Sequence, residues 1–149
     1  ALGLPLAAIK QGLESLQAVK GRLNPKQGRH GGLVIDDTYN ANPSSTAAAI
    51  AVLAEQQGKR ILVLGDMAEL GDTDEQLHFE LGQLAKSVGI DELYSLGRLS
   101  AAASQAFGKG AQAFPSHLTP NTQVLVKGSR SARMERVVDA LVEQGATTC

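Results

Sequence analysis

Short apolar runs alternate with helix-forming stretches along most of this chain, and that alternation restricts the folds open to it. The sequence predicts strands at residues 33–36, 60–64, 92–96 and 124–126, and helices at 44–57, 73–88, 99–107 and 131–144. Strands that alternate with helices build right-handed βαβ units around a parallel sheet. These strands are continuously apolar, as is usual when both sheet faces are covered. We therefore expect an α/β fold with a mostly parallel sheet between two helical layers.

The chain is long enough for one such domain. Its 149 residues are 43% hydrophobic, and a chain of this size buries roughly 70% of its unfolded surface. Nucleic-acid binding normally requires a concentrated excess of Lys and Arg. The net charge of -1 and the pI near 6.3 therefore argue against a nucleic-acid partner.

The sequence predicts neither a membrane span nor a disulfide-bonded protein. The longest apolar stretch, 47–54, is far shorter than the roughly 20 residues that cross a bilayer. Residues 1–20 lack the features of a signal peptide. The only cysteine, Cys149, is terminal, which argues against a disulfide framework and a Cys/His metal cluster. We expect a cytoplasmic protein.

The N-terminal segment has the pattern of an amphipathic helix that Gly21 ends. Apolar residues recur at helical spacing from Leu4 to Leu16, and a polar linker follows as far as Gly32. The chain starts within this pattern and without a Met, which suggests a fragment. We expect residues 1–23 to be the tail helix of a preceding domain with its linker, and residues 24–149 to be a second domain.

The octapeptide DDTYNANP at residues 36–43 follows the first apolar strand. Ligands of open α/β sheets bind beyond the carboxyl ends of the strands, so these polar side chains form a candidate site. Asp36 and Asp37 repel one another, and one of them needs a cation, a metal or a ligand hydroxyl nearby. We expect this of Asp37. Asn42 before a proline is a good helix N-cap, which leaves the two aspartates and Tyr39 unexplained.

A second loop, residues 65–71, leaves the next strand and enters a helix. We expect its Asp66 at the same sheet edge as the octapeptide, where it can hold an ammonium group or serve as a turn residue. TDEQ at 73–76 has the pattern of a capping box at the start of the helix. His78 borders the apolar stripe of this helix, and we expect it to be structural or solvated.

Basic and hydroxyl residues follow the last strand in KGSRSAR, residues 127–133. Arg133 and Arg136 fall in the first turns of the predicted helix, where positive charge opposes the helix macrodipole unless an anion is bound. Gly128 allows close approach of the backbone, and Ser129 with the free helix N–H groups can donate hydrogen bonds. We expect a carboxylate or phosphate site here, against the alternative of a solvated basic surface.

The segment between the helix at 99–107 and the last strand is short. Residues 114–122 cannot hold a crossover helix, because such a connection normally needs a dozen or more residues. Either residues 111–114 form a peripheral strand or part of the natural sequence is missing here.

The sequence lacks the common motifs of independent catalysis. It contains no GxxxxGK(S/T) phosphate loop, no HExxH and no supported Ser/His/Asp or Cys/His set. GKGAQA at 108–113 loosely fits a dinucleotide-binding motif, but it follows a helix instead of a strand. We predict no catalytic residue and no metal site in this chain.

Four segments in order resemble the C-terminal domain of the Mur ligases: Gly21-Arg22, DDTYNANP at 36–43, LGDMAELG at 64–71 and VKGSRS at 126–131. The resemblance covers nearly the whole chain and implies a Rossmann-like three-layer αβα sandwich. It also implies that the initial helix is the tail of the family's central ATPase domain.

The resemblance points to the branch of the family that joins D-alanyl-D-alanine to UDP-N-acetylmuramoyl-tripeptide in peptidoglycan precursor synthesis. In such a three-domain enzyme a central P-loop domain carries ATP and Mg²⁺, ATP phosphorylates the tripeptide carboxylate, and the dipeptide amine attacks the acyl phosphate. The P-loop is absent from this chain. We therefore expect the missing central and N-terminal domains as partners, and no ligation by this fragment alone.

The resemblance also implies site residues. The ATP contacts carried over by motif are Arg22, Asp37, Asn40 and Asn42, with Asp37 on the ribose hydroxyls. The dipeptide contacts expected from charge are Asp66 for the ammonium, and Lys127, Ser129 and Arg130 for the carboxylate or the reacting phosphoryl group.

Two other classes stay open. A response-regulator receiver domain also has paired acidic residues after its first strand and a lysine after its last. Against it, Asp66 follows the second strand where the phosphoacceptor should follow the third, and Lys127 precedes Gly where receivers usually have Pro. The third class is a non-catalytic αβα interaction module, which would bind neither nucleotide nor dipeptide.

Overall fold

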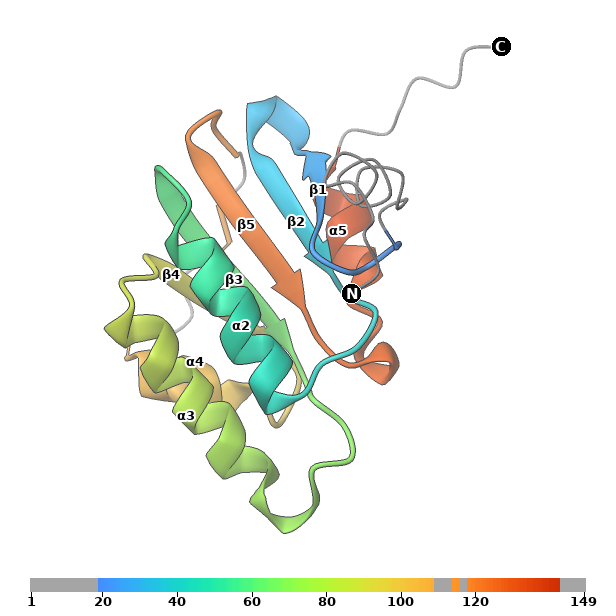
Figure 1. The fold of residues 1–149 in the computed structure, drawn as a ribbon, viewed down its shortest axis with the longest axis vertical. Coiled ribbons are helices and arrows are strands. Elements are labelled where there is room, and N and C mark those ends of the chain that lie inside the picture. The colour runs from blue at the N-terminus through green and yellow to red at the C-terminus, as the bar shows by residue number, and fades with distance from the viewer. Residues whose placement is uncertain (1–18, 109–113, 116–117, 143–149) are drawn as a thin grey trace, which may run out of the picture.

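A computed structural model describes residues 19–108, 114–115 and 118–142 of the chain (Figure 1). The predicted helix before Gly21 and the possible strand at 111–114 lie mostly outside these residues. Phe114, which is described, belongs to no strand. None of the described helices is long and apolar enough to cross a membrane.

The sheet has five strands in the order β1-β2-β5-β3-β4. Their bounds are β1 Asn24–Gln27, β2 Leu33–Asp37, β3 Lys59–Gly65, β4 Glu92–Leu96 and β5 Thr122–Lys127. Strands β2, β5, β3 and β4 are parallel, and β1 pairs antiparallel with β2 at the edge. The expected mostly parallel sheet is confirmed. The segment expected to be a linker contributes the antiparallel edge strand β1.

Helices cover both faces of the sheet, as expected for a three-layer sandwich (Figure 1). Their bounds are α2 Pro43–Ala54, α3 Asp74–Ser87, α4 Ala101–Phe107 and α5 Glu135–Leu141. One core cluster joins the apolar sides of α2, α3 and α4 to one sheet face, with Ile50, Leu81 and Phe107 among its buried members. A second cluster on the other face contains Val138 of α5 together with Leu118.

Two predicted helix starts differ from the structure. The capping box at 73–76 does not form: the Thr73 side chain makes no capping bond, and the 3-10 turn η2 (Gly71–Thr73) precedes α3. The helix predicted at 131–144 is shorter. Its first residues form the 3-10 turn η3 (Arg130–Ala132), Arg133 takes a left-handed φ of 51°, and α5 begins only at Glu135.

The connection from β4 to β5 explains why no helix is needed at 114–122. Helix α4 precedes this segment and packs on the α3 side of the sheet. The chain then passes to the other face, where the Phe114 ring meets Tyr94 edge-on at a centroid distance of 5.0 Å and Leu118 is buried. The connection therefore crosses β3 without a second helix, and the apolar contacts of Phe114 and Leu118 hold its later part against the sheet.

The parallel pairing brings three strand ends together. Asp37 at the end of β2 lies opposite Lys127 at the end of β5, and Leu64 of β3 lies opposite the same lysine. The loops that carry the octapeptide, Asp66 and Ser129 consequently leave the sheet at one edge.

Close packing of α3 on α4 depends on Gly82. A Cβ at this position would lie 2.1 Å from the Ala103 carbonyl oxygen. Alanine gains about 1 kcal/mol of helix propensity over glycine, but overpacking costs about 1–3 kcal/mol. We predict that Gly82→Ala lowers the free energy of unfolding in urea titrations. The neighbouring exposed Gln83→Ala serves as the control and should change it little; a more stable G82A variant would contradict the packing argument.

Candidate functional site

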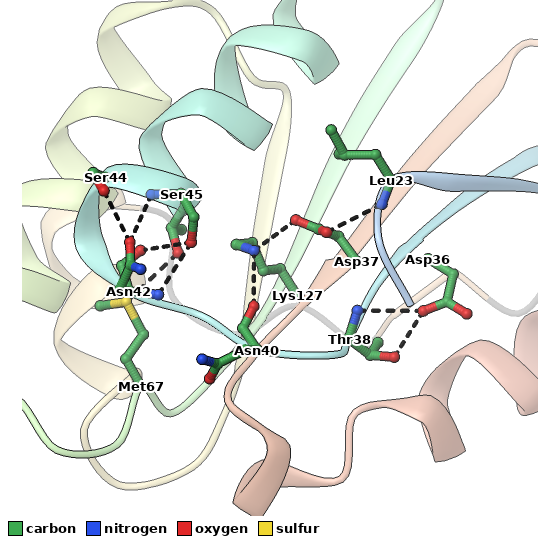
Figure 2. Close-up of polar contacts among 11 residues, drawn as sticks. Leu23, Asp36, Asp37, Thr38, Asn40, Asn42, Ser44, Ser45, Met67 and Lys127 are labelled. Carbon is green, nitrogen blue, oxygen red and sulfur yellow. Dashed lines mark hydrogen bonds and ion pairs between the residues drawn. The ribbon is translucent and has the colours of Figure 1, made fainter. Parts of the chain in front are cut away.

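Lys127 and Asp37 form a buried ion pair at the carboxyl edge of the sheet (Figure 2). Lys127 Nζ donates to Asp37 Oδ2 at 2.6 Å and to the backbone carbonyl of Asn40 at 3.0 Å. Only 2% of the Lys127 side chain and 11% of the Asp37 side chain are exposed. The two side chains on which the predicted shared cleft depends therefore converge.

The adjacent aspartates each have their own lysine. Asp36 Oδ1 accepts a hydrogen bond from the Thr38 hydroxyl at 2.7 Å, and its Oδ2 lies 2.8 Å from Lys26 Nζ of β1. Successive side chains of a strand point to opposite faces, which separates this pair from Asp37 and Lys127. The cation expected beside Asp37 is thus supplied from within the chain.

Asn42 caps helix α2, as expected. Its Oδ1 accepts from the backbone N–H of Ser45 at 2.8 Å and from the Ser44 hydroxyl at 3.0 Å, and Ser45 Oγ accepts from the Asn42 N–H at 3.1 Å (Figure 2). The capping box is therefore found at α2. Because the Asn42 oxygen is committed to the helix, a nucleotide contact by this side chain has to use its amide nitrogen.

A first cleft of about 410 Å³ opens beside the ion pair. Its lining includes all four predicted ATP contacts together with the buried lysine: Arg22, Asp37, Asn40, Asn42 and Lys127. The Asp37 carboxylate also accepts from the Leu23 N–H at 3.1 Å. Each carboxylate oxygen has two acceptor positions, so both retain capacity for a ligand hydroxyl. This donor and acceptor set fits a nucleotide.

Tyr39 is 43% exposed and lies beside two arginines. The guanidinium carbon of Arg22 is 4.6 Å from the ring centroid, and that of Arg130 is 5.6 Å from it. Both distances lie within the range of a cation–π contact. The ring thus contacts both Arg22, a predicted ATP contact, and Arg130, a predicted dipeptide contact. The sequence analysis missed this role of Tyr39, because no local spacing links the three segments.

A second cleft of about 670 Å³ lies on the other side of the octapeptide. Ser129 and Arg130, both predicted dipeptide contacts, line it together with Asn40 and Asn42. The backbone N–H and the hydroxyl of Ser129 both donate to the Asp66 carbonyl, at 3.0 and 2.8 Å. The structure therefore groups Ser129 and Arg130 in this cleft, whereas Lys127 lines the first cleft with the predicted ATP contacts.

The Asp66 carboxylate points toward the start of α4. Its Oδ1 accepts from the Ser100 N–H at 2.7 Å, and a Cβ on Gly97 would collide with both carboxylate oxygens. Partial burial works to raise the pKa of Asp66, but hydrogen bonds from Ser100 and Leu99 outweigh it and leave the pKa below its ordinary value. The ammonium contact proposed for Asp66 thus competes with a structural role.

The loop after β3 is pinned by His78, which is fully buried. Its Nε2 accepts from the Met67 N–H at 3.0 Å, and its Nδ1 lies 2.6 Å from the Asp74 carbonyl. Since a carbonyl only accepts, the proton belongs on Nδ1. His78 is therefore structural, one of the two outcomes expected for it.

The basic segment after β5 does not open a regular helix as expected. The left-handed Arg133 separates η3 from α5, and Glu135 occupies the first turn of α5. Arg130 and Arg133 line the second cleft instead. Among the described residues, no group of three His, Cys, Asp or Glu side chains is arranged to hold a metal ion.

Comparison with known proteins places this geometry in a family. The model of the domain described as "Mur ligase, glutamate ligase domain" matches residues 21–148. The chain belongs to the Mur ligase family. Curated relatives include the UDP-N-acetylmuramoyl-tripeptide–D-alanyl-D-alanine ligases of Escherichia coli, 47% identical over 99% of this chain, and of Haemophilus influenzae, 40% identical over 96%.

Solved Mur ligases share the fold. A MurF crystal structure from Acinetobacter baumannii has a TM-score of 0.79 and 36% identity over 96% of this chain. MurF from Thermotoga maritima in complex with ADP has a TM-score of 0.68 and 29% identity over 89%. The chain covers 35% of each of these two structures, 35% of the E. coli relative and 34% of the H. influenzae relative. It thus spans about a third of their length.

Membership of the Mur ligase family leaves the receiver-domain alternative without support. The topology agrees, because receivers have the strand order 2-1-3-4-5 with all strands parallel. The strand order here is different, and its edge strand β1 is antiparallel.

The family model starts at residue 21, where the chain already contacts the Mur ligase domain. The Gly21 carbonyl accepts from the Tyr39 N–H at 2.9 Å, and Leu23 bonds to Asp37. Residues 1–18 lie outside the described residues, so the domain boundary at residue 23 stays a prediction.

The buried ion pair generates a stability prediction. Lys127→Met leaves the Asp37 carboxylate buried without its cation, and breaking a buried pair in this way costs about 3–5 kcal/mol. Urea unfolding should show this loss, and the double variant Asp37→Leu with Lys127→Met should be more stable than the single variant. The control is Lys59→Met, which removes a partly exposed cross-strand pair with Glu92 and should cost about 1 kcal/mol or less. A K127M loss as small as the control would contradict the argument.

Asp66 generates a pH prediction. Its pKa is lowered in the folded state, so the ionised carboxylate stabilises the fold above the ordinary Asp pKa, and this contribution is lost as pH falls through the lowered pKa. Asp66→Asn should therefore be less stable than the parent near neutral pH, with a gap that narrows in acid. Urea titrations across this range measure it, with the exposed Asp139→Asn as control. A gap independent of pH would refute the assignment.

Proposed function

We propose that this chain is the C-terminal, substrate-binding domain of an ATP-dependent ligase that joins D-alanyl-D-alanine to UDP-N-acetylmuramoyl-tripeptide in peptidoglycan precursor synthesis. Relatives that carry this activity in their names include one that is 47% identical to the chain. The observation that carries the proposal is the pair of clefts at one sheet edge: all four predicted ATP contacts line the first, and the predicted dipeptide contacts Ser129 and Arg130 line the second.

The first cleft is the proposed nucleotide side. Asp37 offers acceptors to ribose hydroxyls, and the exposed guanidinium of Arg22 offers positive charge to phosphates. Asn40 and Asn42 contribute amide groups to the same wall. The ADP complex of the T. maritima relative supports nucleotide use by this family. Mg²⁺ would be held mainly by the central domain.

The second cleft is the proposed dipeptide side. Ser129 and Arg130 supply a hydroxyl and a cation suited to a carboxylate. Lys127 lies beside the nucleotide cleft, which favours the reacting phosphoryl group over the dipeptide as its neighbour. Asp66 supports the second cleft through its carbonyl, which receives both Ser129 hydrogen bonds.

Both clefts are open in this domain, and the central domain would close over them. ATP would phosphorylate the tripeptide carboxylate, and the dipeptide amine would then attack the acyl phosphate with release of phosphate. The contribution of these residues would be positioning and charge stabilisation. The cytoplasmic location that we propose is supported by the single terminal cysteine of the chain.

The test is phosphate release by the full-length ligase that carries this domain, with ATP, the UDP-linked tripeptide and D-alanyl-D-alanine. We expect release that depends on the dipeptide, and none from the 149-residue chain alone. Arg22→Ala should raise the KM for ATP by about ten- to a hundredfold, because a hydrogen bond to a charged group is worth about 1.5–3 kcal/mol.

The matched control is Arg98→Ala. Arg98 is 77% exposed and pairs only with the exposed Glu75 among the described residues, so its loss should leave the KM for ATP unchanged. A wild-type enzyme that releases no phosphate with the dipeptide would refute the proposed function. An unchanged KM for ATP in R22A would refute the role of the first cleft.

A further inference from the structure

The second cleft carries opposite charges on two of its walls. Glu69, in the loop after β3, is its acidic lining residue, while Arg130 and Arg133 line it from the segment after β5. All three side chains are exposed. A cleft with an anion on one wall and cations on another is suited to a small zwitterion.

Glu69 has no structural task that would explain its position. Among the described residues, no ion pair or side-chain hydrogen bond involves the Glu69 side chain, and the φ of Glu69, 64°, is left-handed. That conformation costs a residue other than glycine about 1–2 kcal/mol. Such strain is typically retained where a side chain has a functional role.

The loop that carries Glu69 is held firmly at its start. His78 binds the Met67 backbone, and the Met67 side chain is fully buried. Glu69 is therefore presented by an anchored loop. Asp66, the carboxylate predicted for the ammonium, points instead to the Ser100 N–H.

We propose that Glu69 is the positioning residue for the ammonium end of the dipeptide, with Arg130 and Arg133 holding its carboxylate. This inference rests on the proposed function and names the side chain that orients the amine within it. The cleft volume of about 670 Å³ lies within the range of small-molecule sites. Two extended residues span roughly 7 Å, so a dipeptide can bridge opposite walls of such a cleft.

The inference is tested in the full-length ligase with Glu69→Gln, which keeps the shape and removes the charge. The KM for D-alanyl-D-alanine should rise about tenfold, with the KM values for ATP and the UDP-linked tripeptide unchanged. The second probe is the dipeptide analogue in which a hydroxyl replaces the ammonium. Its inhibition constant should be the same for E69Q and the parent enzyme, because it has no positive charge to lose.

Two further variants separate binding from folding. Glu69→Gly also removes the charge but relieves the left-handed backbone, so it should fold at least as well and show the same rise in KM. Glu55→Gln is the matched control, since Glu55 is exposed at the opposite end of α2 and should leave every KM unchanged.

The outcomes distinguish this inference from the proposed function. A parent enzyme without dipeptide-dependent phosphate release refutes the function itself. An active parent whose E69Q variant keeps the KM for the dipeptide overturns the inference alone. An equal loss of affinity for the dipeptide and its hydroxyl analogue also overturns it, because Glu69 would then act on the shape of the cleft and not on the ammonium.

Discussion

The buried pair of Lys127 and Asp37 is the interaction on which the site depends. Taking two charges out of water costs several kcal/mol per ion, and only good geometry with further hydrogen bonds repays it. Here Lys127 Nζ also reaches the Asn40 carbonyl, and Asp37 also accepts from the Leu23 N–H. The pair consequently joins two neighbouring strands, the start of the octapeptide loop and the segment that enters the domain. Removing either charge would release several segments at once.

Because these internal charges are already paired, the exposed charges of the clefts come from other residues. Both aspartates at the end of β2 are neutralised by lysines of the sheet. Arg22, Arg130 and Arg133 then give the edge an excess of exposed positive charge, which Glu69 offsets on one wall of the second cleft. Such a field favours phosphates and carboxylates as ligands. The octapeptide looks acidic in the sequence, but the exposed charge that a ligand meets at this edge is mainly positive.

From residue 33 onward the sequence was sufficient for the order of strands and helices, because the spacing of apolar residues is a local signal. Pairing between distant segments is not local, so the antiparallel edge strand at Asn24–Gln27 was missed.

The shortened last helix was also missed because its cause is a contact between distant segments. Met134 is fully buried, and a Cβ at Gly65 or Gly128 would lie 2.6 Å from its side chain. Met134 packs over these two glycines. The residue before it, Arg133, takes the left-handed conformation that interrupts the predicted helix. The convergence of Asp37 with Lys127 was predictable, since parallel strands end at one edge, whereas the contacts of Tyr39 with Arg22 and Arg130 were not.

The octapeptide forms the wall between the two clefts, since Asn40 and Asn42 line both of them. This wall is fixed at each end: Lys127 holds the Asn40 carbonyl, and the reciprocal cap joins Asn42 to Ser45. Between them Ala41 is buried in the core. A transfer between two bound ligands is fast only when their reacting atoms are held about 3–3.5 Å apart, and small displacements reduce the rate steeply. A loop held at both ends keeps the two clefts at a defined spacing, so that reacting groups that reach past the loop can be aligned. The same helix cap that stabilises α2 therefore also helps to position the loop that lines both clefts in the proposed ligase.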